Sequence, residues 1–303
     1  MEMMLNLAGT KVTLALSAQI REVEHIVRLL YGDFFVLARR TEAEIRVSSL
    51  KIPKDRFLFD TAGRDSVFER LLPSGEVEEW LRKLPVYKED FPFSHRTISS
   101  FCPGGLLLFN PETAGGHIYL FKQAIDNLHS LYRLLWIYFA QVLGEKGSCF
   151  LHAAALVKEE DGYLFMGDSG AGKSTIARFC PECLIFSDDA PIFLGHNGEY
   201  RVYPSPYHQL GPVKGLDKDV IQMNARVKGL YFLNKDNRAF LGSISKKKAL
   251  SMILKRYIHF FTFLSAQAKS TIFDLFFEAC DKLPTYNLHF RRDKDVLSII
   301  SRE

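Results

Sequence analysis

Short apolar runs separated by turn residues and prolines dominate the first third of the chain, before a long stretch with helical spacing. The predicted strands lie at residues 11–16, 34–37 and 105–109. From about residue 120 to residue 143, apolar side chains recur every three or four positions, which predicts a helix that ends at Gly144. We therefore predict an α+β domain over residues 1–120 and a connecting helix over residues 121–147.

From residue 148 onward, apolar runs alternate with turns and helical stretches. Residues 149–157 predict one strand, and a charged turn joins it to a second strand at 163–166. Further strands are predicted at 184–186, 191–194, 199–203, 229–233 and 286–290, and helices at 174–179, 247–259, 266–283 and 293–300. Asn197-Gly198 is a strong hairpin signal between two of these strands. The pattern predicts an α/β domain with α+β character and a mixed sheet over residues 148–303.

A glycine-rich run, Gly-Asp-Ser-Gly-Ala-Gly-Lys-Ser-Thr, stands between a predicted strand and a predicted helix and fits the P-loop pattern G-x-x-x-x-G-K-[ST]. Glycines let successive backbone N–H groups point at phosphate oxygens, and the helix start adds the positive end of its dipole. Lys173 suits the β- and γ-phosphates, and the Ser174 hydroxyl suits Mg²⁺. The expected ATP-binding residues are Gly167, Asp168, Ser169, Gly170, Ala171, Gly172, Lys173, Ser174 and Thr175.

Two neighbouring carboxylates, Asp188 and Asp189, follow the strand predicted at 184–186. Folds with a phosphate loop place their second Mg²⁺ contact on a carboxylate at the end of an adjacent strand. Strand, loop, helix, strand and paired aspartates in this order predict a nucleotide site.

Composition narrows the class of protein. Of 303 residues, 47% are hydrophobic, which is enough for a core, and the net charge of +4 is spread among mixed signs, so no nucleic-acid-binding face is expected. No membrane span or convincing signal peptide is evident. Five scattered cysteines indicate a reducing compartment, so we expect a cytoplasmic protein. Cys180 and Cys183 read as flanking a turn.

The second part of the chain resembles the catalytic domain of the HPr kinase/phosphorylase family, a relative of phosphoenolpyruvate carboxykinase. The likeness rests on three segments: Leu-His-Ala around His152, the loop itself, and Leu-Ile-Phe-Ser-Asp-Asp ending at Asp189. It covers about residues 148–303 and is specific over 150–195. The two-part layout is also similar to that of family members that phosphorylate a serine of a lasso-peptide precursor.

The resemblance implies a serine kinase that uses ATP and Mg²⁺. In that family the residue matching Asp188 is the general base for the acceptor hydroxyl. The residue matching Asp189 binds the metal together with Ser174. The opposite assignment of these two roles to the two aspartates stays open. The residue matching His152 lies near the transferred phosphoryl group, and its alternative is a core histidine on a buried strand. Asp188, His152 and Lys173 are thus the expected catalytic residues.

The chain departs from the family pattern where the acceptor binds. Thr175 stands where the family has Glu, and the family's Arg-Gly-Leu-Gly loop is echoed only by Lys-Gly-Leu at residues 214–216. Arg226 is a further candidate for phosphate contact. A serine of a protein or peptide is the expected acceptor. Two other functions stay open: a small-molecule kinase or carboxykinase-like enzyme, and a non-catalytic regulator that binds nucleotides. Many family members are hexamers, which leaves a homo-oligomer open as well.

Overall fold

The computed structural model describes residues 2–16, 24, 27–28, 31–36, 41–50, 70–72, 74–83, 91, 93–102, 104–121, 127–180, 182–207, 218–221, 223–291 and 297–300. The chain is a mixed α/β protein with two mixed sheets. It divides into two compact units, one of Met1–Glu145 with Thr262–Ser265 and one of Lys146–Phe261 with Ala266–Glu303.

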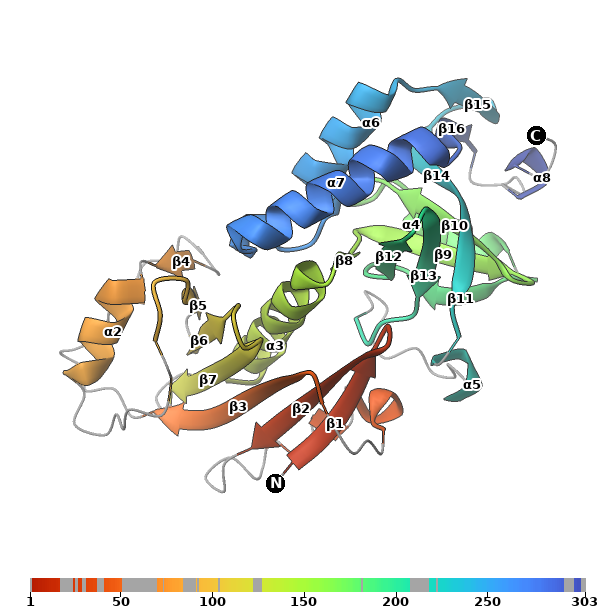
Figure 1. Ribbon diagram of the computed structural model, residues 1–303. Coiled ribbons are helices and arrows are strands. Elements are labelled where there is room, and N and C mark those ends of the chain that lie inside the picture. Colours follow the sequence, from red (N-terminus) through yellow and green to blue (C-terminus); the bar gives the residue numbers. More distant parts are fainter. Residues whose placement is uncertain are drawn as a thin grey trace. The chain divides into compact units, whose positions relative to one another are not determined.

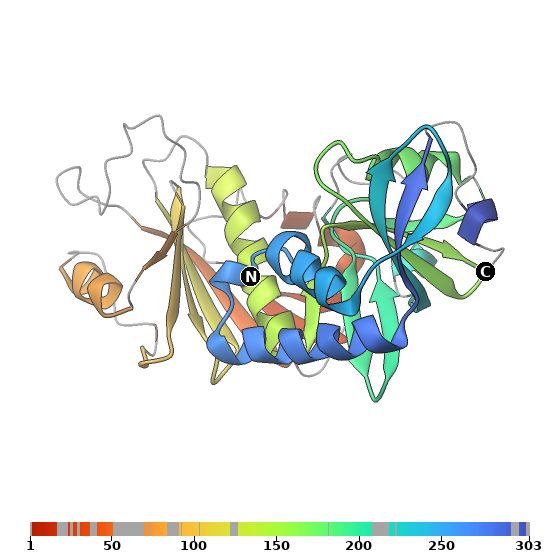
Figure 2. The same cartoon turned by 90° about the horizontal axis from the view of Figure 1, so that it is seen from above.

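The first unit is built on a sheet whose strands run in the order β1-β2-β3-β7-β6-β5-β4, with β3 parallel to both neighbours (Figure 1). The strands are β1 Glu2–Leu7, β2 Thr10–Leu16, β3 Ala43–Leu50, β4 Arg70–Leu72, β5 Ile98–Cys102, β6 Gly105–Asn110 and β7 Gly115–Phe121. The helices are α2 Ser74–Arg82 and α3 Asn127–Glu145, with a 3₁₀ turn at Gly32–Phe34. Figure 2 shows α3 alongside these strands, and it packs on β5, β6 and β7.

Two predictions for this unit need correction. The helix begins at Asn127 and not near residue 120, because Leu120 and Phe121 belong to β7 and pair with β3 and β6; residues 122–126 lie outside the described residues. The strand predicted at 34–37 is wrong over its start, where Phe34 ends the 3₁₀ turn and Phe35 forms only an isolated bridge to Leu5; residue 37 is not among those described. The strands predicted at 11–16 and 105–109 are confirmed as β2 and β6.

The second unit carries a sheet in the order β11-β9-β10-β14-β13-β12-β8, with β16 added between β14 and β15. Its strands are β8 Ser148–Phe150, β9 Ala153–Lys158, β10 Asp161–Met166, β11 Leu184–Ser187, β12 Ile192–His196, β13 Glu199–Tyr203, β14 Ala225–Lys235, β15 Phe240–Ser243 and β16 Thr285–Phe290. Its helices are α4 Lys173–Phe179, α5 Lys218–Ile221, α6 Lys246–Met252, a π-helical turn Ile253–Tyr257, α7 Ala266–Lys282 and α8 Leu297–Ile300. The 3₁₀ turn Phe261–Phe263 falls where the division between the units crosses the chain.

Local signals account for several of these elements. Ser245 accepts a hydrogen bond from the backbone N–H of Lys248 and caps α6, and α6 and α7 lie side by side (Figures 1 and 2). Asn197 and Gly198 both have positive φ, 52° and 79°, which makes the two-residue turn between β12 and β13. The turn between Cys180 and Cys183 is also confirmed, since the N–H of Cys183 donates to the carbonyl of Cys180.

Two predicted elements are broken where the chain changes neighbours. Residues 149–157 form two strands, because β8 pairs with β12 whereas β9 pairs with β10 and β11. The helix predicted at 247–259 ends as the π-helical turn, after which Ile258 is extended and bridges Leu151. Residues 293–296 of the last predicted helix lie outside the described part, and α8 covers Leu297–Ile300.

Candidate functional site

The glycine-rich loop, residues 167–172, connects the end of β10 to the start of α4. Gly170 and Gly172 have φ of +75° and +115°, a region that other residues adopt only under strain. A Cβ at Gly172 would lie 2.6 Å from Phe290 Cζ, and one at Gly167 would lie 2.6 Å from Ala171 Cβ. The loop therefore folds against its own Ala171 side chain and against β16, and only glycine fits these two close approaches.

A hydrophobic cluster packs α4, the helix that follows the loop, onto the sheet. Ile176 of α4 packs with Ala154, Phe165, Tyr231 and Phe290, which come from β9, β10, β14 and β16. Full burial of a side chain such as Ile176 contributes about 1.5–3 kcal/mol. This cluster fixes α4 on the sheet and thereby sets the position of Lys173, its first residue.

Lys173 turns its ammonium group back onto the loop. Its Nζ donates to the carbonyl of Gly167 at 2.7 Å and lies 2.9 Å from Nε2 of His152. Only 5% of the residue is exposed. Burial lowers the pKa of Lys173, and the negative charges of Asp189, Asp168 and Asp188 offset that effect only in part. The three carboxylates are thus grouped around one buried cation.

His152 sits at the break between β8 and β9. Its backbone N–H donates to the carbonyl of Tyr257 at 2.8 Å, and the next N–H, that of Ala153, donates to the carbonyl of Asp189 at 3.1 Å. Its Nε2 lies 3.3 Å from Oδ1 of Asp189. One ring nitrogen is therefore shared between an ammonium group and a carboxylate.

Ser187 orients the aspartate pair at the end of β11. Its hydroxyl accepts the backbone N–H groups of Asp189 at 3.2 Å and Ala190 at 2.9 Å, and it donates to the carbonyl of Tyr207. Asp188 and Asp189 are both buried. Burial by itself raises the pKa of Asp189, but its contact with His152 and the charges of His259, His152 and Lys173 outweigh burial, so the pKa lies below its ordinary value.

Two residues that the sequence reasoning missed join this site, Arg256 and His259. Arg256 Nη2 forms an ion pair with Oδ2 of Asp168, the second residue of the loop. His259 Nε2 lies 3.2 Å from the carbonyl oxygen of Asp189, and its ring is 5.3 Å from that of His152. Arg256 lies within the π-helical turn and His259 follows it closely; a π-helical turn is a rare conformation that is frequent at functional sites. No spacing in the sequence connects them to the loop, which lies more than 80 residues earlier.

The donor atoms suit magnesium. Ser174 and Asp189 offer a hydroxyl and a carboxylate oxygen, and Mg²⁺ prefers oxygen ligands while keeping several waters and substrate phosphates. Over the described part of the chain, no group of three or more His, Cys, Asp or Glu side chains could hold a metal. A metal ion held largely by phosphates and water needs no such group, so the residues present fit Mg²⁺ that arrives with a nucleotide.

Two weaker candidates do not join the site. Arg226 pairs with Asp161 in the register of β14 and β10, at the opposite end of β10 from the loop. Five residues along a strand span about 16 Å, so Arg226 lies far from the glycine-rich loop. Residues 214–216 are outside the described residues.

Comparisons with protein families and with curated proteins add no assignment for this site, so its residues are interpreted from their geometry. No family model matches the chain, and no curated protein matches it significantly. Among the helices that the structure describes, none combines the length and apolar character needed to cross a bilayer.

Proposed function

We propose that the second unit binds ATP with Mg²⁺ and transfers the γ-phosphoryl group to a serine hydroxyl of a protein or peptide, as an HPr kinase-like enzyme with a P-loop. The observation that carries this proposal is the contact chain from Lys173 through His152 to Asp189. It brings the loop, the histidine before it and the aspartate after it to one place, although His152 lies 21 residues before Lys173 and Asp189 lies 16 residues after it.

ATP binding rests on the loop and its lysine. The backbone N–H groups of residues 169–174 surround the β-phosphate, and Lys173 exchanges its contact with the Gly167 carbonyl for phosphate oxygens. Because the ammonium is already buried beside carboxylates, it is held in place before the nucleotide arrives. Ser174 and Asp189 would hold Mg²⁺, which would supply further neutralisation of phosphate charge.

Transfer rests on Asp188. Its carboxylate accepts the proton of the serine hydroxyl as the serine oxygen forms a bond to the γ-phosphorus; the bond from that phosphorus to the β,γ-bridging oxygen breaks, and ADP leaves. His152 holds Lys173 and Asp189 in their relative positions. Phosphoryl transfer depends mainly on positioning and charge, which this buried group of residues provides.

The test uses the full chain with γ-labelled ATP, Mg²⁺, serine-containing peptides and, in separate reactions, small hydroxyl-bearing metabolites. Label on serine supports the proposal, whereas label only on a metabolite assigns a small-molecule kinase. Asp188→Asn should keep ATP affinity and lower transfer by on the order of 10²-fold or more. ATP binding without transfer to any acceptor would overturn the proposal and favour a nucleotide-binding regulator. A gene for a peptide precursor beside this one would identify the acceptor class.

A further inference from the structure

A row of basic side chains follows α6 and the π-helical turn that continues it. Its members are all exposed and are called the basic stripe: Lys247, Lys248, Lys255 and Arg256. Another side of the same helical segment is buried and consists of Ala249, Ile253 and Tyr257. Residues seven apart lie on nearly the same side of a helix, so Lys248 and Lys255 follow one exposed line.

The basic stripe ends at the candidate site. Arg256 pairs with Asp168 of the glycine-rich loop. The π-helical turn is also tied to the strands beside the loop, because the N–H of His152 donates to the carbonyl of Tyr257 at 2.8 Å. A helical residue advances about 1.5 Å, so Lys247 lies about 13 Å along the segment from Arg256. At about 3.3 Å per residue, this length matches about four residues of an extended chain.

The three lysines of the stripe have no carboxylate to pair with inside the fold. Lys246, the residue just before them, is in use: its Nζ lies 3.0 Å from Oδ1 of Asp281 and 4.0 Å from the centre of the Phe277 ring. Within the part of the chain that the structure describes, the lysine side chains of the stripe form no ion pair. Their positive charge is therefore available to a partner.

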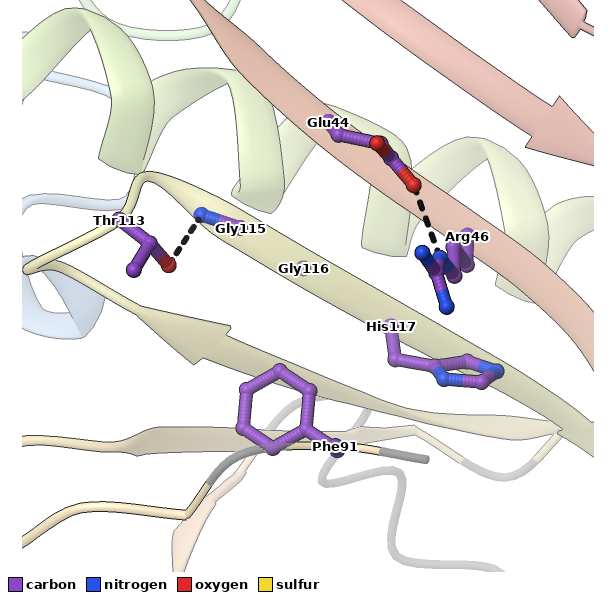
Figure 3. A pocket seen from close by; sticks show the side chains of 7 residues that line it. All are labelled: Glu44, Arg46, Phe91, Thr113, Gly115, Gly116 and His117. Atoms are coloured by element: carbon purple, nitrogen blue, oxygen red, sulfur yellow. Dashed lines mark hydrogen bonds and ion pairs between the residues drawn. The ribbon is translucent and has the colours of Figure 1, made fainter. Parts of the chain in front are cut away.

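An exposed arginine of the first unit shows the difference. Figure 3 shows Arg46 and His117 on neighbouring strands at the edge of a pocket. Nε of Arg46 donates to Oε1 of Glu44 at 2.8 Å, so the fold itself supplies this arginine with a carboxylate. The lysines of the basic stripe would obtain theirs from a bound molecule.

The size and place of the stripe favour a short acidic segment over a nucleic acid. Proteins that bind nucleic acids commonly contact about 6–10 phosphates, whereas the stripe offers three lysines without a partner. Two or three carboxylates of a peptide match these lysines in number. Because the stripe ends beside the loop, a peptide lying along it can present a hydroxyl to the site.

We propose that the basic stripe binds the acceptor, a peptide segment with acidic side chains within about four or five residues of the serine that is phosphorylated. This substrate class presupposes the transfer proposed above. One carboxylate pairs with Lys255 next to the loop, and others pair with Lys247 and Lys248 farther along. Exposed ion pairs are individually weak, so selection of the acceptor depends on several of them together.

The test measures peptide binding without transfer. Three fluorescein-labelled peptides share one serine-containing sequence and carry glutamates before the serine, glutamates after it, or glutamines on both sides. Fluorescence anisotropy with the full-length protein, Mg²⁺ and a non-hydrolysable ATP analogue gives their affinities. We expect at least one acidic peptide to bind about tenfold or more tightly than the glutamine peptide, because about three exposed ion pairs together give this factor. Added salt should reduce the difference.

Lys248→Gln combined with Lys255→Gln should remove most of the preference for the acidic peptide. The matched control combines Lys158→Gln with Lys228→Gln, which changes the charge by the same amount. Both control lysines are exposed and lie at the end of β9, β10 and β14 opposite the loop. This control should keep the preference.

Equal binding of the acidic and glutamine peptides, or an unchanged preference in the Lys248→Gln and Lys255→Gln protein, would overturn the proposal. A single-stranded oligonucleotide that binds more tightly than the acidic peptides, and loses its affinity in the same variant, would also overturn it in favour of a nucleic-acid surface. Failure of the proposed function is a separate result. A peptide that binds through the stripe but takes no label from γ-labelled ATP would contradict serine transfer and leave the acidic-peptide surface in place.

Discussion

The ammonium nitrogen of Lys173 lies 2.9 Å from Nε2 of His152, and the same ring nitrogen is 3.3 Å from Oδ1 of Asp189. A single imidazole nitrogen thus stands between a buried cation and a buried anion. Removing any one of the three leaves a charge without its neighbour, which is more costly inside a protein than at its surface. This relationship makes the three residues a sensitive point of the fold.

Replacing the lysine should weaken nucleotide binding. Lys173→Met keeps the length of the side chain and removes its charge, so we expect ATP affinity to fall by about tenfold or more. Isothermal titration with ATP measures this loss. Lys158→Met is the control, because Lys158 forms an exposed ion pair with Glu182 away from the loop. Unchanged affinity and transfer in Lys173→Met would show that the loop is not the active site.

The two positive-φ glycines of the loop should differ in their tolerance of alanine. Gly172→Ala places a Cβ 2.6 Å from Phe290 at φ +115°, so we expect a loss of about 2–4 kcal/mol in the free energy of unfolding. Gly170→Ala meets nothing within 4 Å and bears only the conformational cost, about 1–2 kcal/mol. Urea unfolding of both variants measures the difference, and equal losses would contradict the close packing of Gly172 on β16.

The ion pair between Arg256 and Asp168 should matter for chemistry more than for stability. Both side chains are about half exposed, 52% and 55%, and such pairs contribute about 0–1 kcal/mol. Arg256→Gln should therefore leave the melting temperature within a few degrees while lowering the transfer rate by about tenfold or more, because a guanidinium beside the loop is available to phosphate oxygens.

Arg201→Gln provides the comparison for Arg256→Gln. Arg201 is a similarly exposed arginine that pairs with Glu199 on the β12–β13 hairpin. It should lose neither ATP affinity nor transfer. If the two arginine variants behave alike, Arg256 has no part in the site.

Asp189 predicts a pH dependence of stability. Its pKa is depressed in the folded protein, so the unfolded state binds a proton more readily, and the stabilisation is present above the ordinary value of 3.8 and is lost as pH falls through the lower folded value. The difference in unfolding free energy between the protein and Asp189→Asn should therefore shrink below about pH 4. Urea unfolding of both proteins from pH 7 to pH 3 tests this, and a constant difference would contradict it.

Much of the second unit was predictable from short stretches of sequence. The loop, the strand before it and the helix after it follow from neighbouring residues, as does the Asn197-Gly198 hairpin. Other features were not. The break at His152 depends on Tyr257 and Asp189, whose carbonyl groups accept the N–H groups of His152 and Ala153. Periodicity cannot show such a break, because every residue around it is apolar.

The sequence by itself determined where the glycine-rich loop lies, because its pattern and the strand and helix that flank it are local, whereas the close approach of Gly172 to Phe290 came only from the packing of β16. Only the tertiary structure decided that Arg256 and His259 border this loop and that Arg226 does not. It likewise placed Arg46 opposite His117 across two parallel strands. Strand register and the packing of the π-helical turn set these contacts, and both depend on burial summed over the whole unit, which no short segment encodes.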